Sequence, residues 1–146
     1  MKLVYNQKED GSAVSDTDII NEIIFTKIAY KDAVKNGYSI DDAEIDQIIT
    51  STKKVIYNDS TNLETLKAYI NQLGISEEQY WDSARNEYRV LYTIGKYRDN
   101  YILSLYKKEK GSLSLDINNP ETNKEFMKYY NRYIEKLKNE STIEYK

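Results

Sequence analysis

Four carboxylates lie close together in the sequence and could bind a metal ion: Asp41, Asp42, Glu44 and Asp46. Carboxylate oxygens are ligands that Ca²⁺ prefers, but an EF-hand loop alternates them about a central glycine. This run has neither the alternation nor the glycine, and the polar stretches DGSAVSDTD and NDSTNLE fail the same comparison. We interpret the run as the acidic first turn of a helix, where negative charge is favourable, and predict no metal site and no cofactor.

Catalytic side chains are scarce, because the sequence contains no His and no Cys. Histidine is the usual general base and the commonest metal ligand, and cysteine is a frequent nucleophile. Carboxylates do occur near one another, as in Glu77 with Glu78 and Asp82 with Glu87. No nucleophile motif or glycine-rich loop accompanies them. We therefore predict that the chain is not an enzyme.

Tyrosine is the residue type in excess, with 15 copies against one Trp and two Phe. Its ring is apolar and its hydroxyl is polar, which suits half-buried positions and binding surfaces. We interpret Tyr88 and Tyr92 first as part of the core or its rim, with a binding role as the alternative. A long helix has more faces than one small core can cover, so Tyr97, Tyr101 and Tyr106 are candidates for an exposed groove. The candidate binding residues are thus Tyr88, Tyr92, Tyr97, Tyr101 and Tyr106.

Charge and hydropathy exclude two classes of protein. A net charge of -3 with a pI near 5.1 argues against binding to nucleic acid, which requires a basic face. No apolar run approaches the roughly 18 residues of a transmembrane helix. The beginning, MKLVYNQKEDG, turns polar too soon for a signal peptide. Two locations stay open: the cytoplasm, or an extracytoplasmic site if an export signal was removed ahead of Met1.

The fold is predicted to be mainly α, with five helices and one small β-sheet. Apolar residues at helical spacing mark the helices, and in the first of them the stripe is Ile20, Ile23, Ile24, Ile28 and Ala29. Ser39 with Asp42, Thr61 with Glu64, and Asn119 before Pro120 are predicted helix starts. The predicted helices span residues 16–36, 39–56, 62–73, 77–107 and 120–140.

The small sheet is predicted at the two ends of the chain. Leu3–Tyr5 and the stretch SAV would form a hairpin closed by the turn residues KEDG. The tail, STIEYK, alternates as a strand does and would pair with this hairpin. The two ends of the chain would then meet.

A tight elbow is predicted within NLETLKAYINQLGISEEQYWDSARNEYRVL, residues 62–91. Gly74 supplies the left-handed residue that ends one helix. Ser76 and Gln79 form a capping box that begins the next helix, and Ile75 can pack onto Tyr80. Several independent signals agree at this turn.

The order of these elements resembles the N-terminal domain of the SurA and PrsA group of bacterial extracytoplasmic chaperones and foldases. The resemblance rests on Asn36-Gly37, on Ser39 to Asp46, and on Gly74, Ser76, Glu78 and the stretch Tyr80 to Arg85. It covers nearly the whole chain, which would be a single domain over 1–146. Its parts would be a hairpin (1–14), a helical core (15–107), a loop (108–118), and a C-terminal helix and strand (119–146).

The resemblance implies a chaperone module that binds unfolded or partly folded polypeptides through apolar and aromatic surface. The parvulin isomerase domain of the family is missing, and KKEKGSLSLDINN stands in its place, so no isomerase activity is implied. The family would place the protein outside the cytoplasm, with a lipid anchor on its precursor. The alternative function is a small helical protein that binds one dedicated partner. The long connection before the last helix also leaves a domain-swapped homodimer as an alternative to a monomer.

Overall fold

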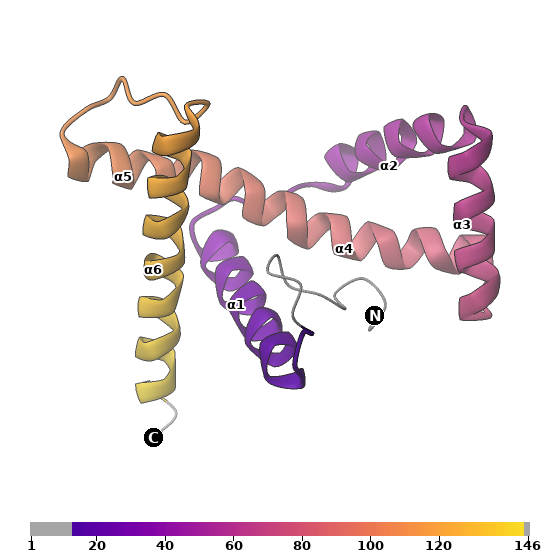
Figure 1. Ribbon diagram of the computed structural model, residues 1–146, viewed down its shortest axis with the longest axis horizontal. Helices are drawn as coiled ribbons and strands as arrows, with labels where there is room; N and C mark the ends of the chain where they lie inside the picture. The colour runs from indigo at the N-terminus through magenta and orange to yellow at the C-terminus, as the bar shows by residue number, and fades with distance from the viewer. Residues whose placement is uncertain (1–12, 145–146) are drawn as a thin grey trace. The chain divides into compact units, whose positions relative to one another are not determined.

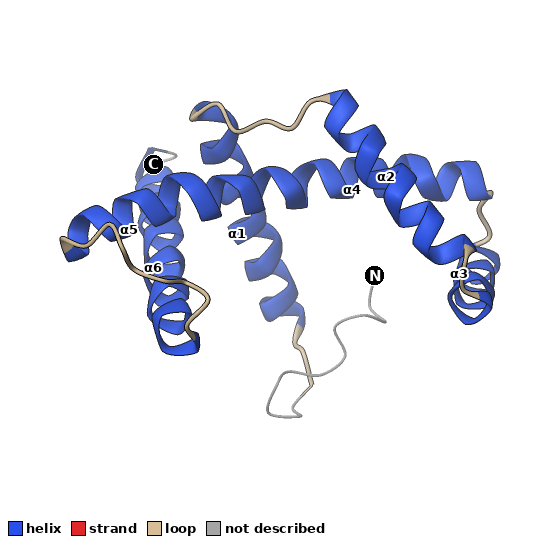
Figure 2. Ribbon diagram, turned by 90° about the horizontal axis from the view of Figure 1, so that it is seen from above, coloured by secondary structure: helices blue, strands red, loops and turns tan. Residues whose placement is uncertain are grey.

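The computed structural model describes residues 13–144, of which 142–144 are described by their backbone alone. These residues are almost entirely helical (Figures 1 and 2). The elements are α1 (Asp16–Lys35), α2 (Asp42–Tyr57), α3 (Ser60–Leu73), α4 (Glu77–Tyr97), the π-helix η1 (Arg98–Ile102), α5 (Leu103–Lys110) and α6 (Pro120–Glu144). Since α4, η1 and α5 follow one another without a break, they correspond to the single long helix predicted from the sequence.

The predicted β-sheet is wrong. The tail continues α6 through Glu144 and forms no strand, and residues 13–144 contain no strand elsewhere. The Ser141 hydroxyl donates to the Leu137 carbonyl oxygen at 2.9 Å, a bond typical of Ser within a helix. Extending an existing helix adds a backbone hydrogen bond per residue, whereas a new strand needs a partner. The predicted hairpin lies mainly in residues 1–12, outside the described residues.

The chain divides into two compact units, which we describe separately. The first contains residues up to Asp32 and from Asn100 onward, and the second contains Ala33–Asp99. One boundary falls within α1, between Asp32 and Ala33, and the other falls within η1, where the α-helical hydrogen-bond pattern gives way to the wider π pattern.

The core of the second unit lies among α2, α3 and α4, and α3 crosses the N-terminal start of α4 (Figure 1). α2 runs antiparallel to α4, because Asp42 at its start contacts Arg89 and Tyr57 at its end contacts Glu77. The buried cluster consists of Ile40, Ile45, Ile49, Leu66, Trp81 and Ala84.

The helix ends of this unit follow local sequence signals. Gly74 has φ 67° and ψ 28°, in the left-handed region, as predicted. Ser76 Oγ accepts from the Gln79 amide at 3.1 Å, and Gln79 Oε1 accepts from the Ser76 amide at 2.9 Å, which confirms the capping box. Two other predicted caps are wrong, because a neighbouring aspartate provides the cap in each case. Asp41 caps α2 in place of Ser39, and Asp59 caps α3 in place of Thr61.

The core of the first unit is rich in aromatic rings from α1, α5 and α6. Phe25 packs edgewise on Tyr130, with ring centroids 5.8 Å apart, and Tyr106 packs on Phe126 at 5.6 Å. Asn119 Oδ1 caps α6 by accepting from the Glu121 and Thr122 amides, and Pro120 begins the helix as predicted.

The apolar stripe predicted for α1 is only partly buried. Ala29 is buried and Ile28 is half-buried, but Ile20, Ile23 and Ile24 are exposed. Phe25 and Ala29, one helical turn apart, share the face that is turned toward the core.

Candidate binding groove on α2 and α4

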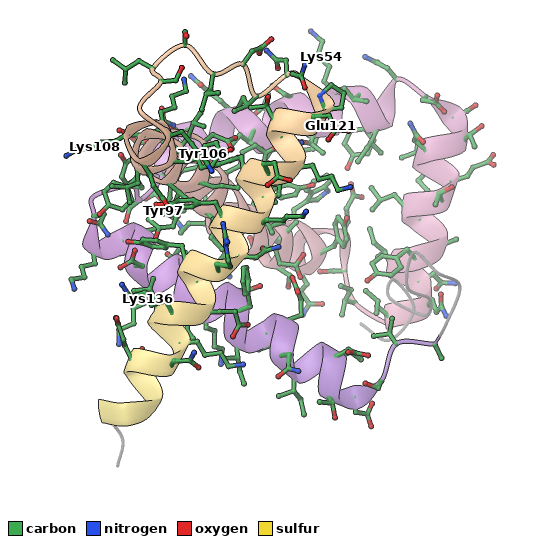
Figure 3. The ribbon with its side chains drawn as sticks, turned by 60° about the vertical axis from the view of Figure 1, so that its left-hand side comes forward. Lys54, Tyr97, Tyr106, Lys108, Glu121 and Lys136 are labelled. Atoms are coloured by element: carbon green, nitrogen blue, oxygen red, sulfur yellow. The ribbon has the colours of Figure 1, made fainter. Side chains whose placement is uncertain are left out.

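The five candidate tyrosines fall into different environments. Tyr97 and Tyr106 are 0% and 4% exposed, Tyr88 and Tyr101 are half-buried, and Tyr92 is 47% exposed. Tyr97 packs edgewise on Tyr38, with centroids 6.0 Å apart, and Tyr106 lies on α5 against α6 (Figure 3). From this set, the structure brings Tyr88 and Tyr92 together, with ring centroids 6.0 Å apart.

The expectation that Tyr97 and Tyr106 line an exposed groove is therefore corrected. It assumed one small core, too short to cover all of the long helix. Instead both rings are buried, and the two tyrosines fall in different units, Tyr97 in the second and Tyr106 in the first. Tyr92, the exposed member of the five, is one that the sequence assigned first to the core or its rim.

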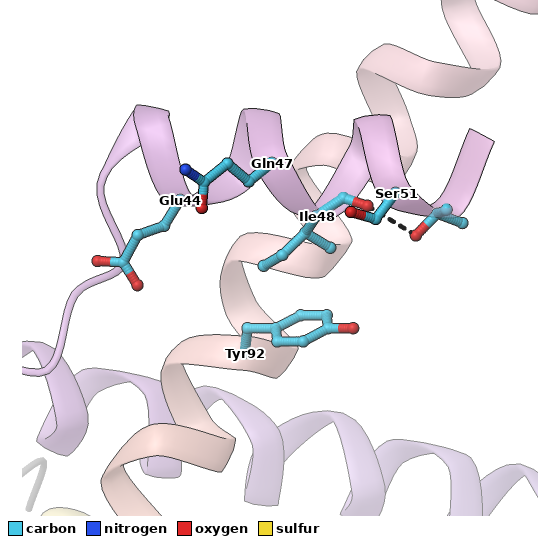
Figure 4. A pocket seen from close by; sticks show the side chains of 6 residues that line it. Glu44, Gln47, Ile48, Ser51 and Tyr92 are labelled. Atoms are coloured by element: carbon cyan, nitrogen blue, oxygen red, sulfur yellow. Dashed lines mark hydrogen bonds between the residues drawn. The ribbon is translucent and has the colours of Figure 1, made fainter. Parts of the chain in front are cut away.

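A pocket of about 370 Å³ lies between α2 and α4, within the second unit. Figure 4 shows the ring of Tyr92, from α4, opposite Ile48 of α2. The Thr52 hydroxyl donates to the Ile48 carbonyl oxygen at 2.8 Å and is held against its own helix. The lining residues of α2 recur at helical spacing, so they share one face of it: Glu44, Gln47, Ile48, Ser51 and Thr52.

A line of aromatic rings continues from this pocket along α4. Tyr80, Tyr88 and Tyr92 lie at multiples of four residues and share one face of the helix, with the small Ala84 between the first two. Tyr69 of α3 packs edgewise on Tyr80, with centroids 6.1 Å apart. We call Tyr69, Tyr80, Tyr88 and Tyr92 the tyrosine row.

The hydroxyl of Tyr80 stays neutral under ordinary conditions. Burial raises the pKa of Tyr80, and Tyr88, Tyr69 and Glu87 nearby raise it further. A neutral phenol can both donate and accept a hydrogen bond, so the row combines apolar ring faces with polar hydroxyls. Sequence reasoning missed Tyr69 and Tyr80 as binding residues, although the four-residue spacing on α4 was a signal for Tyr80.

The opposite flank of the α2–α4 pair is held by ion pairs. Arg89 bonds to the Asp42 carboxylate and donates to the Ile40 carbonyl oxygen at 3.1 Å. Arg85 pairs with Asp46, and its other guanidinium nitrogen lies 3.5 Å from Asp42. Hydrogen bonding to Arg89 holds the pKa of Asp42 below its ordinary value.

These pairs account for most of the acidic run that the sequence offered as a metal site. Asp42 and Asp46 face arginines, Glu44 lies 3.7 Å from Lys96, and Asp41 caps α2. No group of His, Cys, Asp or Glu suited to a metal ion occurs in the described part of the chain.

A second pocket, of about 280 Å³, lies on this charged flank. Lys53 Nζ stands over the Trp81 ring there, 5.1 Å from its centroid, and the Trp81 indole donates to the Tyr57 hydroxyl at 3.3 Å. Because the Arg85 and Asp46 charges in its wall already pair with each other, it is the less suited of the two pockets to a new ligand.

Comparison with known proteins gives one partial similarity. The chain is 30% identical over 87 residues to the chaperone SurA of Vibrio vulnificus (strain YJ016). The match covers 56% of this chain and 20% of that protein, so the chain spans about a fifth of its relative's length. No family model matches the chain, and no solved structure matches it. Among the described helices, none is both long and apolar enough to cross a membrane.

Proposed function

We propose that this chain is a chaperone-like module that holds unfolded or partly folded polypeptides. The binding site would be the pocket between α2 and α4 together with the tyrosine row, which we call the α2–α4 groove. The observation that carries the proposal is the tyrosine row, which leads into the pocket and ends at the half-exposed Tyr92. The partial similarity to the chaperone SurA supports it.

The chemistry of the groove suits weak binding of varied segments. Tyrosine offers a large contact surface and has few rotatable bonds to immobilise, so little entropy is lost on binding. Gln47 and Ser51 on the pocket rim, with the tyrosine hydroxyls, can bond to the backbone of an extended client. The pocket is open and its volume is near the lower end of ordinary ligand sites, so it would take one bulky side chain at a time.

The proposal contains no catalytic step. By the resemblance to the SurA and PrsA group, the residues between α5 and α6 would stand where that group carries its isomerase domain, so we propose holding without prolyl isomerisation. An extracytoplasmic location belongs to the same proposal. An export signal in the precursor sequence would support that location.

A second function is favoured by the polarity of the pocket. Its wall includes Glu44, Gln47 and Ser51 beside Ile48 and Tyr92. A dedicated partner with polar groups placed to match these side chains would bind there more specifically than varied clients would.

The deciding experiment is light scattering of a denatured client in the presence of the protein. Wild type at several-fold molar excess is expected to suppress aggregation, and Tyr92→Ser to suppress it less. Leu91→Ser is the matched control, because Leu91 is 59% exposed on the same helix but does not line the pocket. Failure of the wild type to suppress aggregation would overturn the chaperone proposal and leave the dedicated partner.

A further inference from the structure

α1 carries an exposed apolar patch outside the proposed groove. Ile20, Ile23 and Ile24 are 55%, 44% and 36% exposed, and they are grouped within about one turn of the helix. Asp16, Lys27 and Lys31 are also exposed and lie on the same face by helical spacing. We call these six residues the α1 face.

The two ends of the α1 face carry opposite charges at equal distances from its centre. About the point midway between Ile23 and Ile24, Asp16 lies as far toward the N-terminus as Lys31 lies toward the C-terminus. Ile20 and Lys27 are related in the same way. When a second copy of the helix is laid antiparallel about this point, Ile23 meets Ile24 and each Asp16 meets a Lys31.

We propose that the α1 face binds the α1 face of a second copy of this chain in an antiparallel, two-fold symmetric pair. A two-fold interface requires one surface that is complementary to itself. The α1 face meets this requirement, because the isoleucines lie at the centre, the stem of Lys27 covers Ile20, and an Asp16–Lys31 pair closes each end. A parallel pair would instead place Asp16 against Asp16 and Lys31 against Lys31.

The pair is expected to be weak and to depend on concentration. One helix from each copy buries less than the roughly 1,200 Å² of a stable interface, and exposed ion pairs add little. Among residues 13–144, Asp16, Lys27 and Lys31 form no ion pair with another side chain, so a second copy would displace no ion pair of this part of the chain.

Sedimentation over a wide range of protein concentration tests the charge arrangement. Asp16→Lys or Lys31→Asp alone should raise the dissociation constant at least about tenfold, because two attractions become two repulsions. The double variant, D16K with K31D, should recover the wild-type value. Leu113→Ser is the control, since Leu113 is 84% exposed outside the α1 face, and it should change nothing.

Disulfide cross-linking tests whether the two α1 helices are antiparallel. Because the chain contains no cysteine, a single introduced cysteine can cross-link only to its copy in the second chain. Ile23→Cys should cross-link on oxidation because the two copies of position 23 nearly meet. Asp16→Cys should not, because its two copies lie about 20 Å apart along the helices. Circular dichroism would confirm that each variant is folded. A wild type that stays monomeric at millimolar concentration, or equal cross-linking at both positions, would overturn the proposal.

Discussion

Arg89 joins the start of α2 to the middle of α4 through Asp42. The guanidinium bonds to the Asp42 carboxylate, and it also donates to the carbonyl oxygen of Ile40. The Ile40 amide in turn donates to the Thr93 hydroxyl at 3.2 Å. One arginine therefore positions both the first turn of α2 and Ile40, which lies just before the capping residue Asp41.

The first prediction concerns pH. The pKa of Asp42 is lower in the folded protein than its ordinary value of 3.8, so the folded state prefers the carboxylate. The stabilisation is fully present above pH 3.8 and is lost as the pH falls through the lower folded pKa. Thermal unfolding followed by circular dichroism should show Asp42→Asn less stable than wild type at pH 6. The difference should shrink toward pH 2, and a constant difference would contradict the assignment.

The second prediction compares two glycines. Gly74 has positive φ, whereas Gly95 lies inside α4, and an added Cβ would meet nothing within 4 Å at either position. Only backbone conformation then distinguishes them. Gly74→Ala should destabilise by about 1 kcal/mol and Gly74→Val by more, because L side chains strain the left-handed region. Gly95→Ala should stabilise by about 0.5–1 kcal/mol. Urea unfolding measures the change in free energy of unfolding for each variant. If Gly74→Ala and Gly95→Ala changed it in the same direction, the elbow would not depend on a left-handed residue at position 74.

The third prediction separates buried tyrosines from exposed ones. Tyr97→Ser and Tyr106→Ser should each cost about 3 kcal/mol, because they remove a large buried ring and leave a cavity. Tyr92→Ser should change the free energy of unfolding by no more than about 0.5 kcal/mol, as exposed substitutions usually do. Chemical denaturation decides this. If Tyr97→Ser left the free energy of unfolding unchanged, the Tyr97 ring would have to be accessible to solvent.

The fourth prediction concerns the tail. Deletion of residues 142–146 should leave the unfolding midpoint nearly unchanged, because residues 142–144 form the end of α6 rather than a strand. A truncated protein with a clearly lower melting temperature would show that the tail has a partner.

Local signals in the sequence predicted most of the helices. Gly74, Ser76 and Gln79 act within one turn of chain, so their roles do not depend on distant residues. Asp41 and Asp59 show the limit of such reasoning, because several capping residues stand near each start and small differences in geometry choose among them. The strand prediction for the tail was wrong for a related reason, since a short alternating run is weak evidence against the continuation of a long helix.

The groove could be predicted only in part. The spacing of Tyr80, Tyr88 and Tyr92 is visible in the sequence, but the pairing of α4 with α2 is not, and that pairing places Ile48 opposite Tyr92. Tyr97 and Tyr106 are both buried although they lie in different units of one continuous helical stretch, and the sequence does not show where that stretch divides. Hydrophobic periodicity reports which residues share a face, but not which neighbour covers that face.

The position of Trp81 makes the two units spectroscopically distinguishable. It is the single tryptophan of the chain, is buried in the core of the second unit, and has the Lys53 ammonium over its ring. Indole emission therefore reports on the second unit, while far-ultraviolet ellipticity averages over the helices of both. If the two units melt at different denaturant concentrations, the two signals will give different midpoints without any label. A shared midpoint would mean that the units unfold as one cooperative block.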